Sequence, residues 1–365
     1  MRLAWLEVRD FRNHALTKID PVPDGLIVVV GPNGEGKTNL LEAMQFLYAL
    51  GSPRVSSSEP LVREGTEEAY VRGEFETLEG RVLVEVEVRR RGANRVLVNR
   101  SPVRRKRDLR RQVRSVLFGP FDLPIVTGDP SKRREFMDEA VVLLQPGQDT
   151  LTTAYERVLR QRNRLLKEHE GRGAPSDLEA WDEQLINTGS AVVRARALAV
   201  GALAPPASSA FAPVTGYELV VRYVPNVGAA DDVEAAFRAR LAERRTDELL
   251  RRTSLVGPHR DDLELAVRDL GARAFASHGE TWVAALSLRL GVAGAVQAAL
   301  GEPPIMLVDD PYSALDPSRR DRVAELLAAR DGQVVISVAD DADIPAQALA
   351  IWDIAAGGLT PREAA

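Results

Sequence analysis

The sequence contains no cysteine among its 365 residues and only four histidines. The absence of cysteine excludes disulfide bonds, thiolate-bound zinc, iron–sulfur clusters and a cysteine nucleophile. Four scattered histidines argue against a metal site built from imidazole. Any chemistry therefore has to come from carboxylates, hydroxyls, basic side chains and backbone groups.

Long apolar runs are also scarce. No wholly apolar, uncharged stretch approaches the roughly 18 residues that span a bilayer, so we expect no membrane-spanning helix and no membrane partner. The first residues include acids and form no apolar core, which predicts that there is no secretory signal. We therefore expect a cytoplasmic protein.

Lysine is rare, and positive charge is concentrated in one place. Only five of the 48 basic residues are lysine, so the position of each lysine is informative. The net charge is −5, but residues 89–114 alone carry +11, which leaves −16 for the rest of the chain. An acidic chain with one strongly basic segment predicts a local anion-binding surface.

The remaining composition is that of an ordinary globular protein, with 45% apolar and 28% charged residues. Its length predicts two domains, or one domain with a large insertion. The apolar runs at 26–30, 305–308 and 334–338 predict buried strands, and 81–88 and 96–98 predict a hairpin. Helical spacing dominates 131–200 and predicts an αα-hairpin interrupted at 171–176, whereas 201–215 reads as a connection and the tail after about 355 as loosely ordered.

The motif G-x-x-x-x-G-K-T occupies residues 31–38, between the strand at 26–30 and a helix that begins at Lys37. This is the P-loop pattern, in which glycines let backbone N–H groups surround phosphate oxygens at a helix N-terminus. Lys37 would reach the β- and γ-phosphates of ATP, and Thr38 would bind Mg²⁺. We expect the nucleotide to contact Gly31, Pro32, Asn33, Gly34, Glu35, Gly36, Lys37, Thr38 and Asn39.

A P-loop needs a second carboxylate for Mg²⁺ at the end of a neighbouring strand. Asp309 follows the apolar run at 305–308, and Asp310 beside it could orient or deprotonate the attacking water. An acidic strand end with no role in catalysis is the alternative. Because Lys37 and Asp309 lie near opposite ends of the chain, we expect a split head formed by 1–130 and 255–365, with a helical lobe inserted at 131–254.

This plan matches an ABC-type ATPase head, which carries a third element. The segment Ser277–Glu280 opens a predicted helix and is a candidate signature, in which Ser277 and Gly279 would contact the ATP of a second subunit. A plain helix cap is the alternative. Ser313–Asp316 has the form of a D-loop, so we expect Asp316 at the same dimer seam.

These residues resemble the RecF family, bacterial recombination mediators related to the ATPase heads of SMC and Rad50 proteins. The resemblance spans nearly the whole chain. Its most specific blocks are KTNLLEA at 37–43 and GPHRDD at 257–262, and further blocks lie at 11–13, 33–42, 118–138, 161–166 and 307–320. The expected fold is an α/β, P-loop, ABC-type head with a mixed sheet and flanking helices, and with a mainly α-helical inserted domain.

Three departures from the family pattern concern hydrolysis. Phe121 stands where relatives usually have an acid, with Asp122 as a possible substitute for the Q-loop residue. The signature reads ASHGETW, where relatives more often read ASQGQQR, and no histidine lies near Val338 to act as a switch. We therefore expect slow hydrolysis.

The resemblance implies an ATP-dependent homodimer that binds DNA at single-strand/double-strand junctions and acts with RecR and RecO to load RecA. Slow, DNA-stimulated hydrolysis would release it, and it would reside at the nucleoid. Candidate DNA contacts are Arg104, Arg105, Lys106 and Arg107, with a solvated basic face as the alternative. Lys132, Arg133 and Arg134 would contact either DNA or buried acids, and we expect His259 and Arg260 to hold a loop.

Two other classes of protein stay open. One is an ATP-gated DNA clamp with negligible turnover, and the other is an ABC-type ATPase that serves a membrane transporter.

Overall fold

The computed structural model describes residues 1–169 and 174–362. The chain divides into two compact units. Unit 1 contains residues 1–123, 206–218 and 276–365, and unit 2 contains residues 124–205 and 219–275. The nucleotide-binding motif and the two acids at 309–310 both fall in unit 1.

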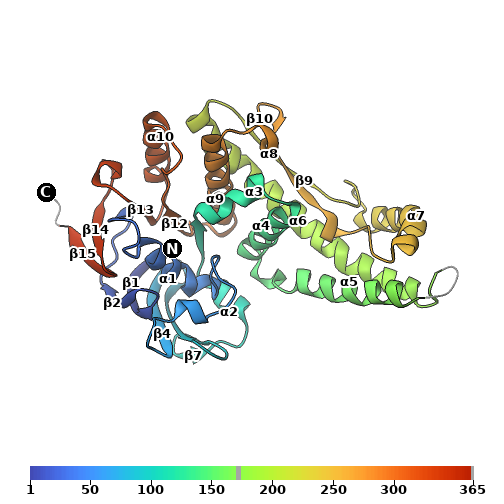
Figure 1. Cartoon of the computed structure of the whole chain (residues 1–365), viewed down its shortest axis with the longest axis horizontal. Coiled ribbons are helices and arrows are strands. Elements are labelled where there is room, and N and C mark those ends of the chain that lie inside the picture. The colour runs from blue at the N-terminus through green and yellow to red at the C-terminus, as the bar shows by residue number, and fades with distance from the viewer. Residues whose placement is uncertain (170–173, 363–365) are drawn as a thin grey trace. The chain divides into compact units, whose positions relative to one another are not determined.

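A six-stranded sheet with the strand order β15-β14-β3-β13-β12-β8 forms the centre of unit 1 (Figure 1). All neighbouring strands pair in parallel except β15, which is antiparallel at one edge. Every residue of β3, β8, β12 and β13 is buried, as expected for a parallel sheet covered on both faces. The bounds are β3 Leu26–Val30, β8 Ser115–Phe118, β12 Ile305–Asp309, β13 Val334–Val338, β14 Ala350–Ala355 and β15 Gly358–Arg362.

The three predicted buried strands are confirmed, at 26–30 and 334–338 residue for residue. The prediction that the tail after about 355 is loosely ordered is wrong as far as residue 362, because β14 and β15 form a hairpin. The sequence conceals this hairpin because exposed edge strands such as β15 carry little apolar signal. Residues 363–365 lie outside the described part of the chain.

A second, antiparallel sheet of unit 1 has the strand order β2-β1-β4-β5-β6-β7. The predicted hairpin is confirmed, since β5 pairs with β6. The valines at 82, 84, 86 and 88 are all buried while the residues between them are partly exposed. The bounds are β1 Arg2–Phe11, β2 His14–Ile19, β4 Glu68–Thr77, β5 Gly80–Arg89, β6 Arg95–Val98 and β7 Ser101–Pro102.

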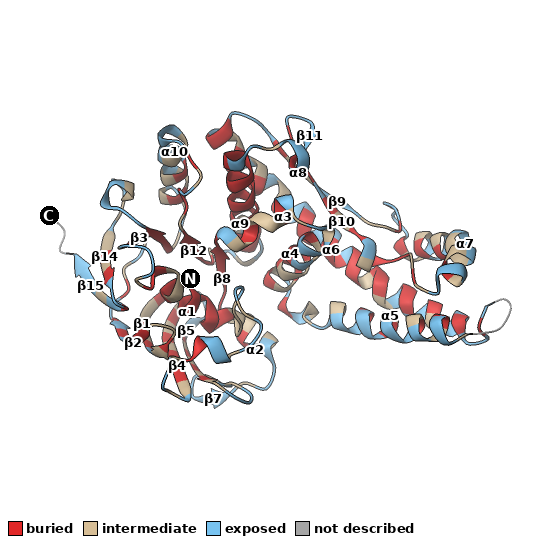
Figure 2. Cartoon of the chain, in the orientation of Figure 1, coloured by how far each residue is buried: buried red, intermediate tan, exposed pale blue. Residues whose placement is uncertain are grey.

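Helices of unit 1 cover these sheets. Figure 2 shows that α9 is buried along most of its length, and its apolar residues surround the whole helix instead of one stripe. The α-helices are α1 Lys37–Ala49, α2 Lys106–Arg110, α9 His278–Leu300 and α10 Pro317–Ala328, and the 3₁₀ turns are η1 Glu59–Leu61, η2 Pro120–Asp122 and η5 Asp341–Asp343.

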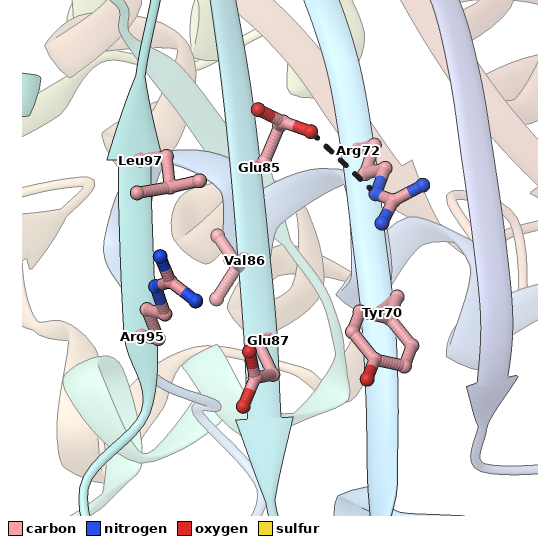
Figure 3. A pocket seen from close by; sticks show the side chains of 7 residues that line it. All are labelled: Tyr70, Arg72, Glu85, Val86, Glu87, Arg95 and Leu97. Atoms are coloured by element: carbon pink, nitrogen blue, oxygen red, sulfur yellow. Dashed lines mark ion pairs between the residues drawn. The ribbon is translucent and has the colours of Figure 1, made fainter. Parts of the chain in front are cut away.

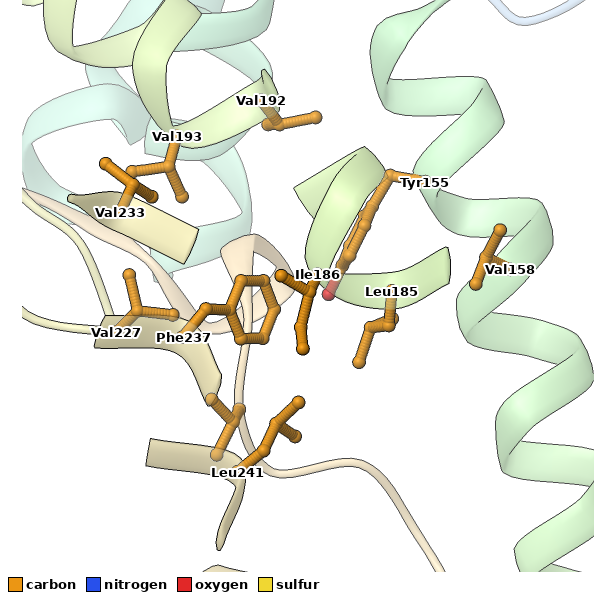
Figure 4. Close-up of a cluster of buried hydrophobic side chains, with 11 residues drawn as sticks. Tyr155, Val158, Leu185, Ile186, Val192, Val193, Val227, Val233, Phe237 and Leu241 are labelled. Carbon is orange, nitrogen blue, oxygen red and sulfur yellow. The ribbon is translucent and has the colours of Figure 1, made fainter. Parts of the chain in front are cut away.

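Unit 2 is mainly helical and carries a small antiparallel sheet of order β11-β10-β9. Helices α5 and α6 come before and after residues 170–173, which lie outside the described part of the chain. Both helices share one apolar cluster with α7 (Figure 4). The elements are α3 Leu123–Thr127, α4 Pro130–Leu144, η3 Pro146–Gln148, α5 Leu151–Glu168, α6 Leu178–Thr215, β9 Leu219–Val224, α7 Val233–Arg251, η4 Pro258–Arg260, β10 Asp262–Val267, β11 Leu270–Gly271 and α8 Ala272–Phe275.

The structure corrects the expectation of a connection at 201–215, because α6 continues unbroken to Thr215. Its last residues belong to unit 1, where Pro206 packs so closely on Gly294 of α9 that an added Cβ there would lie 3.0 Å from it. Unit 2 also begins at 124 and includes 255–275, whereas the sequence places the lobe at 131–254. Half of the predicted break, 171–173, lies outside the described residues, and in the other half the break is confirmed, because 174–176 are not helical.

Among the described residues, α6 and α9 are long and apolar enough to cross a membrane, judged by length and composition only. The absence of a membrane-spanning helix stays a prediction. In α9, 72% of the apolar window is buried inside the protein, and in α6 39% is buried. Core helices of soluble proteins pass the same test, so this is weak evidence for a membrane span.

A buried ionic cluster holds the α5–α6 hairpin of unit 2. The side chain of Arg162 is 0% exposed, and its three nitrogens donate to Asp182 at 2.8 Å, to Glu248 at 2.6 Å and to Ser254 at 2.6 Å. Both carboxylates are themselves buried. A buried charge of this kind is tolerated only while its partners remain in place.

Replacing Arg162 with Met leaves Glu248 buried without its cation, so we expect the free energy of unfolding to fall by about 3–5 kcal/mol. The matched control is Arg164→Met, two residues away on the exposed side of α5, where Arg164 pairs with Glu168 in solvent. That change should stay within about 0.5 kcal/mol. Guanidinium unfolding, followed by circular dichroism, measures the free energy of unfolding of both variants. Equal unfolding midpoints for the two variants would contradict the stabilising role of the Arg162 cluster.

Candidate nucleotide-binding site

The loop between β3 and α1 has the backbone that a phosphate-binding turn requires. Gly34 and Gly36 have φ values of 90° and 114°, in the region that residues with a Cβ rarely adopt. Gly36 is the N-cap of α1 and supplies no side chain to its N–H groups, and no acid lies in the first helical turn. The N-terminus of α1 therefore presents free donors and a partial positive charge.

Lys37 lies over this loop. Its ammonium donates to the carbonyl oxygens of Gly31 and Pro32, the latter at 2.9 Å, and reaches Asn33 Oδ1 at 3.5 Å. Burial lowers the pKa of Lys37, while the nearby carboxylate of Asp309 opposes that shift. The lysine is thus aligned along the loop, with negative charge close by.

Thr38 and Asp309 meet across the sheet although 271 positions separate them. The hydroxyl of Thr38 donates to the Asp309 carboxylate, with distances of 3.0 Å to Oδ1 and 2.9 Å to Oδ2. A hydroxyl and a buried carboxylate together are oxygen ligands of the kind that Mg²⁺ uses when phosphates complete its shell. The donor set therefore fits Mg²⁺, and the described residues contain no richer group of three or more acids and histidines.

Asp310 follows directly, with an unusual backbone. Its φ is 52°, in the left-handed region, where Asp is better tolerated than most residues. Burial raises the pKa of Asp310, and the neighbouring charge of Asp309 adds to that rise, while a hydrogen bond with Ser313 opposes it. The carboxylates of Asp309 and Asp310 both lie close enough to Lys37 to oppose the lowering of its pKa. The structure therefore brings together Lys37, Asp309 and Asp310, which are three of the predicted site residues.

Residues 12–14 support the loop, a role that the sequence analysis did not assign. Asn13 donates to the carbonyl of Glu35 at 2.9 Å and accepts from Asn39 at 2.8 Å. The Asn13 side chain also packs directly against Gly36, since a Cβ added to Gly36 would lie only 2.6 Å from the Asn13 amide nitrogen. Arg12 forms a two-pronged ion pair with Glu42 of α1, at 3.0 and 2.9 Å. The Phe-Arg-Asn block was the signal for this arrangement.

The turn between β14 and β15 also holds the loop. The N–H of Gly357 donates to the carbonyl of Glu35 at 3.1 Å, and the N–H of Ala356 donates to the Glu35 carboxylate. His14 is fully buried, and its Nε2 and Nδ1 atoms lie 3.1 and 3.0 Å from the carbonyl oxygens of Gly36 and Gly357, so whichever nitrogen carries the proton can donate to one of them. The C-terminal hairpin thus positions the nucleotide loop.

Ser277 and Gly279 begin α9, as predicted. Ser277 is exposed and forms a reciprocal cap with Glu280, whose N–H lies 3.3 Å from the serine oxygen. Gly279 lies close to the D-loop, since an added Cβ would be 3.3 Å from the carbonyl of Ala314. Asp316 is the N-cap of α10. Within the described residues, no hydrogen bond joins these three residues to the loop at 31–39.

Several charged residues have structural partners instead. Asp122 is buried against Arg289 of α9, at 2.7 Å, so it does not offer the free carboxylate of a Q-loop. Arg133 pairs with Asp262 at 2.6 Å, and His259 bonds to Tyr155 at 2.6 Å. Further pairs join Lys132 to Glu135 and Arg134 to the carbonyl of Asp261.

The four basic residues at 104–107 divide into two groups. Lys106 reaches the carbonyl of Leu50 at 3.5 Å, just past the end of α1, and Arg110 reaches that of Ala49 at 3.3 Å. These cations compensate the negative end of the α1 dipole. Arg104 and Arg105 are exposed, Arg107 is partly exposed, and none of the three forms an ion pair within the described residues.

The outer face of the antiparallel sheet carries balanced charge. A pocket of about 120 Å³ lies on this face, where Arg72 pairs with Glu85 at 3.7 Å. Figure 3 shows Glu87 on the strand beside Arg95, its partner in the strand register. No residue of the nucleotide loop lines this pocket. Unneutralised positive charge is therefore concentrated nearer β7 and α2.

Comparisons with known proteins agree with this geometry. A family model described as the RecF/RecN/SMC N-terminal domain matches residues 2–349. The chain is 41% identical to the DNA replication and repair protein RecF of Streptomyces avermitilis, over 94% of this chain and 95% of the relative. It is 40% identical to that of Frankia alni, over 98% of each chain.

Solved structures extend the likeness. The recombination mediator protein RecF with ATP, of the RecFOR pathway, superposes with a TM-score of 0.86 at 26% identity, covering 99% of this chain and 98% of that one. An Smc head domain from Pyrococcus yayanosii has a TM-score of 0.62 at 15% identity, over 100% and 97% of the chains, which shows the fold alone. The expected α/β, ABC-type head is confirmed, and the chain belongs to the RecF family.

Proposed function

We propose that this chain is an ATP-dependent DNA-binding protein that dimerises around ATP and hydrolyses it slowly. The observation that carries the proposal is the contact of Thr38 with Asp309, which joins the P-loop to the acidic strand end. Relatives at 41% and 40% identity are DNA replication and repair proteins, and the solved RecF structure with ATP supports the choice of nucleotide.

The residues of the site suit a triphosphate with Mg²⁺. The free N–H groups at the start of α1 and the Lys37 ammonium would bind phosphate oxygens, and Thr38 and Asp309 would hold Mg²⁺. When bound, Mg²⁺ neutralises charge on the phosphates. Asp310 is the candidate that orients or deprotonates the attacking water, because burial raises its pKa and so makes it a stronger base than an exposed aspartate.

The other face of the nucleotide would come from a second copy. The start of α9 is exposed at Ser277, and a serine hydroxyl with a helix N-terminus is suited to the γ-phosphate. Gly279, two residues on, is buried against the carbonyl of Ala314, and Asp316 is exposed at the start of α10. Two copies would then enclose two ATP molecules.

We expect wild type to dimerise only with ATP and Mg²⁺ and Lys37→Met to remain monomeric, because the mutant lacks the cation that binds the phosphates. Sedimentation velocity measures this. The control is Lys167→Met on the exposed face of α5, which should behave as wild type. A wild type that stays monomeric with saturating ATP and DNA contradicts the mechanism.

DNA binding would use the basic edge around β7 and α2. Six arginines there form no ion pair within the described residues, so their charge is available to phosphates: Arg91, Arg100, Arg104, Arg105, Arg107 and Arg111. None belongs to a base-reading motif, so we expect recognition of DNA shape, such as a junction, by phosphate contacts.

Changing Arg104, Arg105 and Arg107 together to Gln should weaken duplex binding, because contacts with DNA phosphates are lost. Each lost contact should also reduce the steepness of log K against log salt by about 0.9. Fluorescence anisotropy at several salt concentrations measures the slope. The control triple, Arg157, Arg160 and Arg164 to Gln, removes the same charge from exposed positions of α5. Equal slopes for the two triples would contradict the assignment.

Slow hydrolysis would release the protein from DNA. Asp122 is held by Arg289, and no histidine lies near Val338, so two groups that assist hydrolysis in many ABC-type enzymes are missing here. By its family the chain would act in the cytoplasm, at the nucleoid, with RecR and RecO to load RecA. An ATP-gated clamp with negligible turnover is the competing function that the same two observations favour.

Asp310→Asn distinguishes these functions, since Asn tolerates the left-handed backbone at this position. We expect hydrolysis to fall about 10²–10⁴-fold and the dwell time on DNA to lengthen. Single-molecule fluorescence measures the dwell time. An unchanged dwell time would show that hydrolysis does not time release and would favour the clamp.

A further inference from the structure

The strand β13 contains one polar residue, Ser337, in an otherwise apolar run. Its side chain is 0% exposed, so its hydroxyl needs a partner inside the protein. The parallel register pairs Ser337 with Asp309 of β12 on one side and with Val29 of β3 on the other. Side chains at paired positions of neighbouring strands point to the same face, so Ser337 lies beside the carboxylate of Asp309.

Ser337 makes two hydrogen bonds, one to each acid. Its hydroxyl donates to Asp309 Oδ1 at 2.7 Å. The same oxygen accepts the backbone N–H of Asp310 at 3.0 Å. One buried hydroxyl therefore connects the carboxylate predicted to bind Mg²⁺ with the backbone of the predicted base.

These bonds constrain the two acids differently. Asp309 receives hydroxyl donors from Ser337 and Thr38, and together they hold its carboxylate in one rotamer facing the P-loop. Asp310 has a left-handed backbone, and the bond to its N–H holds that conformation against relaxation into an ordinary strand end.

We propose that Ser337 is a positioning residue for ATP hydrolysis, which sets the Asp309 carboxylate for Mg²⁺ and fixes the backbone from which Asp310 acts. The inference rests on the proposed function. Within the described residues, the Ser337 side chain hydrogen-bonds to Asp309 and Asp310 and to no residue of the loop at 31–38. Its effect should therefore depend on Mg²⁺, while nucleotide affinity without the metal stays unchanged.

The test compares wild type, Ser337→Ala, Ser337→Thr and the control Ser287→Ala. Ser287 is also buried in unit 1, on α9, and its hydroxyl has no hydrogen-bond partner within the described residues. The probe is ATP with a fluorescent ribose label, titrated in EDTA and again in Mg²⁺. The ratio of the two dissociation constants reports the gain in affinity that Mg²⁺ confers.

We expect Ser337→Ala to match wild type in EDTA and to lose about tenfold of the Mg²⁺-dependent gain, which corresponds to about 1.4 kcal/mol. At saturating Mg²⁺, kcat should fall about tenfold, because the backbone of Asp310 is no longer held. KM should rise in step with the dissociation constant measured in Mg²⁺, because slow chemistry makes the two equal. Ser337→Thr, which keeps the hydroxyl, should recover both, and Ser287→Ala should match wild type throughout.

The role of Ser337 would be overturned by an unchanged Mg²⁺-dependent gain in Ser337→Ala, by an equal loss of affinity in EDTA and in Mg²⁺, or by the same defect in Ser287→Ala. A Ser337→Thr protein that binds normally in EDTA but behaves like the alanine variant in Mg²⁺ counts against it too. A wild type that binds no labelled ATP overturns the proposed function itself.

Discussion

The register of the parallel strands β3, β13 and β12 is the constraint on which the site depends. It places the end of β3, and therefore the nucleotide loop, beside the residues that end β12 and β13. A slip of one residue would turn Asp309 and Ser337 to the opposite face of the sheet. Because every residue of these strands is buried, such a slip would also disrupt packing on both faces of the sheet. Core packing therefore determines where Asp309 and Ser337 lie relative to the loop.

Much of this head was predictable from the sequence because the strong signals are local. The run at 26–30, the glycines at 31–36 and the helix after Lys37 each specify their own backbone, and the wholly apolar strands lack any alternative pattern. The placement of Asp309 beside Thr38 required one further step, the expectation that distant parallel strands share an edge. That step succeeded because a P-loop without a second acid is chemically incomplete.

The parts that could not be predicted depend on tertiary partners. Prolines at 205 and 206 suggested a connection, yet packing of the helix end on α9 outweighs their local preference. Lys106 looked like one more cation of a basic run, and only the structure shows that it lies beyond the end of α1. The polar Ser337 within a strand was a usable signal, because a buried hydroxyl must find a partner.

The contacts of Glu35 with the turn after β14 have a consequence for how the protein is made. The loop at 31–38 is synthesised well before Asp309, Ser337, Ala356 and Gly357, with which it or its neighbours form hydrogen bonds. Until residues 309–357 have left the ribosome, the loop lacks these contacts. The early part of unit 1 therefore reaches the geometry described above only after β12, β13 and β14 have joined the sheet.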